Sequence, residues 1–204
     1  MDNYLDNINA YYTSKLRQFG NTPSGVDWRD EASQLTRFKQ LTKIITKNRF
    51  SILDYGCGYG ALYNFLKKEK NEFSYLGYDI SEEMIAAAAN DKNDDVDCFF
   101  TADELRLQPC KYVIASGIFN VRLDVIDSEW EQYISNTLEK INSLSMDGFS
   151  FNMLPSYADT ALKKKYLYYA DPSWIEKQCK KITTGNVEVL KNYGLFEFTV
   201  LITK

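Results

Sequence analysis

Three glycines at alternate positions, Gly56, Gly58 and Gly60, constrain the fold of this chain more than any other feature of its sequence. They close a short apolar run that begins near Ser51, which is the pattern of a buried parallel strand, and a helical segment follows them. A strand, a glycine turn and a helix form the corner of an α/β sheet that holds phosphates or nucleotides. Glycine is needed there because a ligand must approach the backbone more closely than a Cβ atom permits.

The glycines by themselves leave two interpretations of this corner open. The residues from Gly56 to Ala61 fit the dinucleotide pattern G-x-G-x-x-G/A, and they also fit an acidic residue followed by G-x-G-x-G. The stretch Ile52-Leu53-Asp54-Tyr55-Gly56-Cys57-Gly58-Tyr59-Gly60 resembles motif I of the class I S-adenosylmethionine-dependent methyltransferases. An acid two residues before the first glycine and a Gly-Cys-Gly core are typical of that family, whereas a nicotinamide site has no need of the acid.

Length and charge limit the classes of protein that the chain can belong to. Its 204 residues predict a single domain, spanning 1–204, with a substantial core. The net charge of −4 and the isoelectric point near 5.0 argue against a nucleic-acid surface. The first residues have no signal-peptide pattern and no apolar run is long enough to cross a bilayer, so we expect a cytoplasmic protein with no membrane partner.

The absence of histidine from the sequence restricts the chemistry of any site. A general base must be Asp, Glu, Tyr, Lys, Cys or water. The usual metal ligand is missing and the four cysteines are scattered, so we predict no zinc site and reduced thiols, while a carboxylate-bound magnesium site stays open. The cysteines are Cys57, Cys98, Cys110 and Cys179.

The order of apolar runs predicts an N-terminal helical cap over 1–48 and a core over 49–204. The periodicity predicts helices at 1–19, 33–47, 61–70, 81–89 and 128–144, and strands at 50–55, 73–79, 96–101, 112–116, 148–154, 187–193 and 195–202. An insertion at 156–181 is expected to be helical in two pieces, broken at Asp171-Pro172. Alternating strands and helices predict a parallel sheet with helices on both faces, and the last two strands predict an antiparallel pair.

The family resemblance makes these expectations more specific. It implies a Rossmann-like three-layer α/β sandwich whose seven strands lie in the order 3-2-1-4-5-7-6, with strand 7 antiparallel. It also implies S-adenosyl-L-methionine as the cofactor and S-adenosyl-L-homocysteine as its product. The leader residues Tyr12, Trp28, Gln34 and Arg37 stand in a pattern that resembles the leader of small bacterial, trans-aconitate-methyltransferase-like members.

Acids follow the first three predicted strands, at the edge where open α/β sheets bind ligands. Asp79 can accept two hydrogen bonds from a ribose diol, and the resemblance implies that role for it. The resemblance likewise places adenine near Asp103 and between Ile80 and Met84, although a surface aspartate and a core methionine remain the alternatives. The predicted cofactor-binding residues are Asp54, Gly56, Cys57, Gly58, Gly60, Asp79, Ile80, Met84, Asp103, Glu104, Ser116, Gln34 and Arg37.

The acceptor is expected to meet the methyl group after the fourth strand, from Ser116 onwards. Asn120 is a candidate to orient the acceptor, and Arg122 either holds an acceptor carboxylate or phosphate or forms a surface ion pair. Tyr12 and Trp28 are further candidates, because an aromatic ring can face the positively charged sulfonium of the cofactor. The alternative is that both side chains only pack against neighbouring residues. The catalytic groups themselves stay open.

We therefore predict an S-adenosylmethionine-dependent methyltransferase acting on a small-molecule acceptor, with oxygen favoured over nitrogen. Basic residues at 163–165 and 180–181 either bind an anionic acceptor or form a solvated helix face. A hydroxyl acceptor needs a base, for which Asp27 and Asp124 are candidates, whereas a carboxylate acceptor needs none. The alternatives are an NAD(P)-dependent oxidoreductase and a non-catalytic cofactor-binding partner subunit. A monomer or a homodimer is expected.

Overall fold

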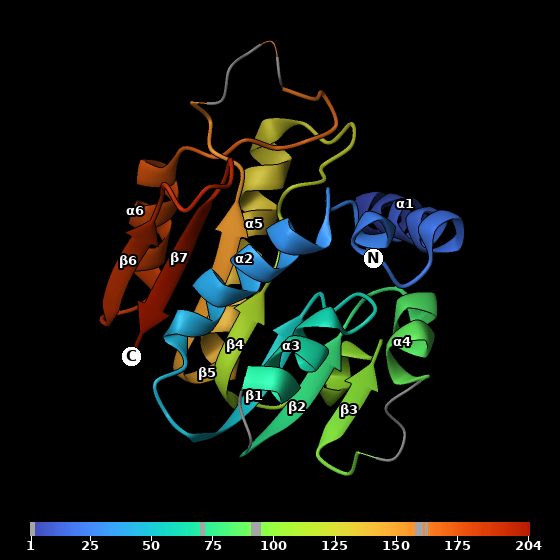
Figure 1. The fold of residues 1–204 in the computed structure, drawn as a ribbon. Coiled ribbons are helices and arrows are strands. Elements are labelled where there is room, and N and C mark those ends of the chain that lie inside the picture. Colours follow the sequence, from blue (N-terminus) through green and yellow to red (C-terminus); the bar gives the residue numbers. More distant parts are fainter. Residues whose placement is uncertain (1–2, 70–71, 91–94, 158–160, 162) are drawn as a thin grey trace.

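The chain folds around one seven-stranded sheet in the order β3-β2-β1-β4-β5-β7-β6, which confirms the predicted topology (Figure 1). The structure is a computed structural model, and it describes residues 3–69, 72–90, 95–157, 161 and 163–204. The strands β1 to β5 are parallel, and β7 is antiparallel to both β5 and β6. The strands are β1 Arg49–Tyr55, β2 Glu72–Tyr78, β3 Cys98–Thr101, β4 Cys110–Ala115, β5 Ser145–Met153, β6 Asn186–Leu190 and β7 Phe198–Thr203.

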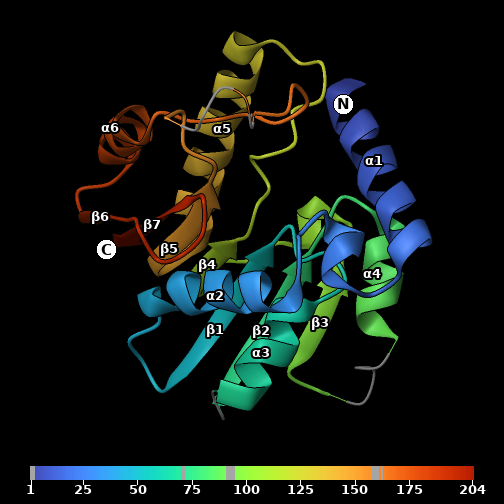
Figure 2. The ribbon, with the colours of Figure 1, turned by 45° about the horizontal axis from the view of Figure 1, so that its top comes forward.

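Helices cover both faces of this sheet, as the alternation of strands and helices predicts. The helices α2 and α3 lie on one face, and α5 and α6 lie on the other (Figures 1 and 2). The α-helices are α1 Asn3–Phe19, α2 Glu31–Leu41, α3 Ala61–Glu69, α4 Glu82–Ala89, α5 Asp127–Leu144 and α6 Pro172–Ile182, and the short 3-10 helices are η1 Pro23–Val26, η2 Thr42–Ile44 and η3 Glu104–Arg106.

The two faces bury separate apolar cores because neighbouring residues of a strand point to opposite faces. In β1, Ile52 packs in the core beneath α2 and α3, whereas Leu53 packs in the core beneath α5 and α6. Both side chains are fully buried. The glycine turn that follows β1 is therefore anchored from both sides of the sheet.

The described part of the leader folds back over the carboxyl ends of the strands. Helix α1 runs alongside α4 (Figure 2), where Thr13 and Ser81 hydroxyls lie 2.9 Å apart and Arg17 pairs with Glu83. Helix α2 begins at Glu31, earlier than expected, because Asp30 and the third helical residue form a reciprocal capping box. The capping aspartate was the sequence signal for this boundary.

The insertion differs from the sequence expectation. Its second helix is present as α6, but residues 163–171 form turns and isolated bridges instead of a first helical piece, and residues 158–160 and 162 lie outside the described part. The backbone groups here bond to other segments: the Tyr168 N–H donates to the Asn120 carbonyl at 2.8 Å, and the Ala170 N–H donates to the Leu154 carbonyl at 2.8 Å. Because these partners satisfy the backbone, the segment gains little from helical hydrogen bonds.

Candidate functional site

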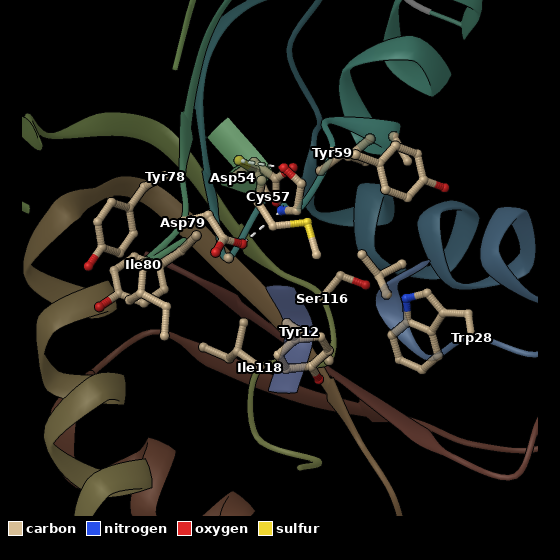
Figure 3. A pocket seen from close by; sticks show the side chains of 18 of the residues that line it. Tyr12, Trp28, Asp54, Cys57, Tyr59, Tyr78, Asp79, Ile80, Ser116 and Ile118 are labelled. Carbon is tan, nitrogen blue, oxygen red and sulfur yellow. Dashed lines mark hydrogen bonds between the residues drawn. The ribbon is translucent and has the colours of Figure 1, made fainter. Parts of the chain in front are cut away.

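A pocket opens at the carboxyl ends of β1, β2 and β4, beneath α1 and the η1 turn (Figure 3). It holds about 890 Å³ of space, including its mouth. Its wall combines glycine backbone, carboxyl groups and a large number of aromatic rings. The predicted site residues that line it are Tyr12, Trp28, Gln34, Asp54, Gly56, Cys57, Gly58, Asp79, Ile80, Met84 and Ser116.

The glycine turn forms the floor of the pocket and can only be built from glycine. Gly56 and Gly58 have φ angles of 82° and 53°, in the left-handed region. A Cβ atom on Gly56 would lie 2.3 Å from the Ile118 side chain, and one on Gly58 would lie 2.9 Å from the Val26 side chain. The turn is therefore in direct contact with the loop after β4 and with the leader.

Asp79 joins the end of β2 to this turn. One carboxyl oxygen accepts from the Gly58 N–H at 2.9 Å, and the other accepts from the Ser81 N–H at 2.9 Å. Burial raises the pKa of Asp79, and these two N–H groups act in the opposite direction. A carboxylate has about four lone-pair sites, so two acceptor positions remain for a ligand in the pocket.

Asp54 lies at the bottom of the pocket and is 2% exposed. Its carboxyl group accepts a hydrogen bond from the Tyr75 hydroxyl. Burial raises the pKa of Asp54 to about 7, the Tyr75 hydrogen bond lowers it, and the nearby Asp79 raises it further. Two buried carboxyl groups thus share one end of the site.

Tyrosine side chains form much of the remaining wall. Tyr55, Tyr78 and Tyr133 line the pocket together with Tyr12. Burial raises the pKa of all four phenols, that of Tyr133 to about 12. At neutral pH these groups keep their protons, so they can donate hydrogen bonds but cannot act as bases.

The loop after β4 carries a buried hydroxyl into the pocket. The Ser116 Oγ atom has no hydrogen-bond partner among the described residues, and Figure 3 shows it between Cys57, Tyr12 and Trp28. The next residue, Gly117, has a φ of 79°, and a Cβ atom there would lie 2.4 Å from the Trp28 ring. An unpaired buried hydroxyl is costly without a partner, so it points to a polar ligand at this position.

Comparison with known proteins identifies the family. Residues 52–140 match the family model described as a methyltransferase domain. A protein of Mycobacterium tuberculosis, named "Putative methyltransferase Rv1506c", is 44% identical over 159 residues, which are 76% of this chain and 93% of that protein. The chain belongs to the class I S-adenosylmethionine-dependent methyltransferases.

Solved structures agree with this methyltransferase fold. The magnesium protoporphyrin IX methyltransferase (ChlM) from Synechocystis PCC 6803, with SAM bound, superposes with a TM-score of 0.69 at 14% identity, over 100% of this chain and 98% of that one. The DhpI-SAM-HEP complex superposes with a TM-score of 0.70 at 13% identity, over 100% and 99%. The cofactor is S-adenosylmethionine. The glycine floor that excludes Cβ atoms and the unpaired Ser116 hydroxyl fit such a ligand.

Four predicted cofactor residues of the methyltransferase lie outside the pocket lining, namely Gly60, Asp103, Glu104 and Arg37. Gly60, with a φ of 78°, sits where the turn enters α3. The Asp103 carboxylate accepts from the Leu105 N–H at 3.0 Å and so caps η3. Glu104 accepts from the Tyr55 hydroxyl at 3.2 Å and pairs with a lysine of α5. The Tyr55 contact therefore places Glu104 next to a residue of the pocket lining.

The other predicted residues outside the lining make structural contacts. Arg37 forms a buried ion pair with Glu197 at 2.7 Å. The Asn120 side-chain oxygen accepts from the Leu154 N–H at 3.3 Å. The Arg122 guanidinium donates to a backbone carbonyl three residues on and lies 3.6 Å from an aspartate of α5. All three therefore shape the loops around the pocket.

The sequence analysis did not single out several pocket residues as ligand contacts, among them Tyr78, Gly117, Ile118 and Tyr133. Tyr78 is the last residue of β2 and directly precedes Asp79, so its position at the strand end could have indicated a contact with the ligand. Tyr133 belongs to α5, which is distant in sequence, so no local pattern indicated it. In the part of the chain that the structure describes, no group of three or more metal-ligating side chains is placed to hold an ion, and no helix is long and apolar enough to span a membrane.

Proposed function

We propose that this methyltransferase transfers the methyl group to a small-molecule acceptor, with oxygen favoured over nitrogen. The roof over the pocket is the observation that carries the proposal. Val26 contacts the glycine floor, Trp28 contacts Gly117, and α1 is tied to α4 by the Thr13–Ser81 contact. A pocket covered in this way suits a small molecule better than a polymer chain.

The lining phenols and Asp27 offer no free base to an acceptor, which favours an oxygen nucleophile that needs no deprotonation. The lining phenols have raised pKa values, so none is a base at neutral pH. Asp27, a candidate base, is already engaged, because it accepts from the Tyr11 hydroxyl at 2.8 Å and pairs with Lys15 at 3.0 Å. A carboxylate acceptor carries its own nucleophilic charge, and it is the acceptor that we favour.

We propose that the cofactor is held along the glycine floor. S-adenosylmethionine supplies an electrophilic methyl group on a positively charged sulfur. Asp79 offers its two free acceptor positions to the ribose hydroxyls, and Ile80 and Met84 supply apolar contacts for the base. The Ser116 hydroxyl and the Trp28 ring lie on the opposite wall, where they would orient the reacting groups.

An anionic acceptor is consistent with the side chains between α1 and the insertion. The rings of Tyr11 and Tyr166 lie 6.1 Å apart, which brings residues 163–169 against α1. The Lys164 ammonium donates to the Tyr166 hydroxyl at 3.2 Å, and Lys15 lies on the α1 side. Asp27 pairs with Lys15, so Lys15, Lys164 and Asp27 together carry one net positive charge, which would attract an anion.

The test combines binding and turnover. Calorimetric titration of the purified protein should show binding of S-adenosylmethionine and S-adenosylhomocysteine, and Asp79→Ala should abolish it. Glu176→Ala changes an acid of α6 that pairs with Lys180 and does not line the pocket, and it serves as the control, for which binding should persist. Labelled S-adenosylmethionine is then incubated with panels of small carboxylic acids, alcohols and amines. Label transfer to an amine and not to an acid or alcohol would refute the preference for oxygen.

A non-catalytic cofactor-binding subunit is the second candidate for this chain. It would bind S-adenosylhomocysteine in the same titration and transfer no label to any acceptor panel. Binding of NAD(P) in place of the sulfur cofactors would instead contradict the family assignment.

A further inference from the structure

A buried network of charged and polar side chains lies behind the wall that faces the acceptor. Glu197 precedes β7 and is 2% exposed, and one of its carboxyl oxygens accepts from Arg37 Nε at 2.7 Å and from Asn152 Nδ2 at 3.2 Å. Asn152, in β5, in turn accepts from the Gly117 N–H at 3.0 Å. The network therefore runs from α2 through β7 and β5 to the loop that lines the pocket.

The same network also supports the aromatic roof. The Arg37 guanidinium carbon lies 3.7 Å from the centroid of the Trp28 ring. Trp28 is in contact with Gly117, so the two ends of the network meet at one point of the pocket wall. Arg37 Nη1 is buried without a hydrogen-bond partner among the described residues, so only part of its hydrogen-bonding capacity is used.

A gain in folding stability does not explain the buried ion pair between Arg37 and Glu197. Moving an ion pair out of water costs free energy that its attraction only partly returns, and apolar replacements of similar volume are often as stable. Burial raises the pKa of Glu197, while Arg37, Asn152 and Tyr193 act to lower it. Buried polar groups of this kind are better explained by the geometry that they impose.

Glu197 determines which way the Asn152 amide points. An asparagine side chain has a donor end and an acceptor end that differ little in shape. The carboxylate of Glu197 can only accept, so it binds the NH₂ end of Asn152. The oxygen of Asn152 is thereby directed to the Gly117 N–H. Without the carboxylate the amide can rotate, and two donors would then face each other at Gly117.

We propose that Glu197 is a positioning residue of the methyltransferase site. Through Asn152 it holds the backbone of Gly117, and through Arg37 it holds Trp28, so that the Ser116–Ile118 wall keeps the shape that the ligands require. This inference rests on the proposed function, because it assigns the residue to the wall where we place the reacting groups.

The test separates positioning from stability. The double variant Arg37→Met/Glu197→Leu replaces the ion pair by apolar side chains and should keep the thermal unfolding midpoint of the wild type. Its affinity for S-adenosylhomocysteine should fall about tenfold, the scale of one misdirected hydrogen bond. Hydrogen exchange in the segment around Gly117 should become faster in the double variant.

The matched control is Ser150→Ala, in the same strand as Asn152. Ser150 is fully buried and donates to the Leu41 carbonyl at 2.9 Å, away from the network. This variant should lose stability and keep its affinity for S-adenosylhomocysteine. Asn152→Leu removes the acceptor of the Gly117 N–H and leaves the Arg37–Glu197 pair in place, and it tests the network if the double variant does not fold.

The positioning role and the proposed function would be refuted by different results. A folded double variant, or Asn152→Leu, with wild-type affinity and wild-type exchange at Gly117 would overturn the positioning role. If the wild type itself binds neither sulfur cofactor, the proposed function fails before the variants are compared.

Discussion

Replacing Asp54 by asparagine should change how the stability of this methyltransferase depends on pH. The folded protein keeps a proton on Asp54 up to about pH 7, whereas the ordinary value for an aspartate is 3.8. Between these values the folded state binds more protons than the unfolded state, so this carboxyl makes the free energy of unfolding fall as pH rises. Asp54→Asn removes that titration and leaves an oxygen that can accept from the Tyr75 hydroxyl.

The size of the effect follows from the shift in pKa. The difference between 3.8 and about 7 is about three units, and each unit corresponds to about 1.4 kcal/mol. The stability of Asp54→Asn relative to the wild type should therefore improve by up to about 4 kcal/mol between pH 4 and pH 8. The loss in the wild type should be concentrated between those two pH values.

Urea unfolding of both proteins at several pH values gives the two curves. The nearby Asp79 is also buried, and because it titrates in both proteins, most of its contribution cancels in the difference. Ser150→Ala, which removes a buried hydroxyl and no titrating group, is the control and should run parallel to the wild type. A constant difference between Asp54→Asn and the wild type over the whole pH range would refute the reasoning.

Three further outcomes are expected. Gly58→Ala should lower the stability by about 1–2 kcal/mol because the backbone there is left-handed, and it should weaken S-adenosylhomocysteine binding because the new Cβ atom displaces Val26. Gly194→Ala is the control, because Gly194 has a φ of 83° and open space around it. In the same thermal and calorimetric assays it should lose stability without losing affinity. Trp130→Phe loses a buried donor that bonds a backbone carbonyl at 3.0 Å, and urea unfolding should show a loss of roughly 1–3 kcal/mol. Arg17→Ala breaks an exposed ion pair and should leave the thermal midpoint unchanged; a clear fall would show that this pair anchors α1.

The half of the site formed by the glycine turn could be predicted because its chemistry is local in sequence. Gly56 and Gly58 must adopt left-handed angles, so only one residue type fits, and the pattern is visible in a few letters. Asp54 and Asp79 stand at strand ends, and parallel strands bring their carboxyl ends to one edge. The strand order followed from the family resemblance alone, whereas the alternation of strands and helices predicted a parallel sheet with helices on both faces.

The first helical piece of the insertion was predicted wrongly because periodicity does not show where backbone partners come from, whereas the second piece is present as α6. Tyr166 and Tyr168 stand in a segment that was expected to be helical, yet their backbone groups bond the loop after β4. Partners in another segment compete directly with intrahelical bonds, and here they satisfy the backbone of 163–171. A prediction from local pattern cannot include that competition.

Arg37 shows the same limit for side chains in the site. It stands three residues after Gln34 on one helix, and the leader resemblance led us to expect both residues at the cofactor. Gln34 does line the pocket and accepts from the Tyr59 hydroxyl at 3.1 Å, but Arg37 is drawn to Glu197, which is 160 residues away in sequence. A buried guanidinium needs a carboxylate, so the position of that carboxylate decides where the arginine points. The Ser116–Ile118 wall is therefore set by contacts between β5, the residue before β7 and α2. If the acceptor binds at this wall, as we propose, its specificity should change with Glu197 and Asn152 while the glycine floor stays the same.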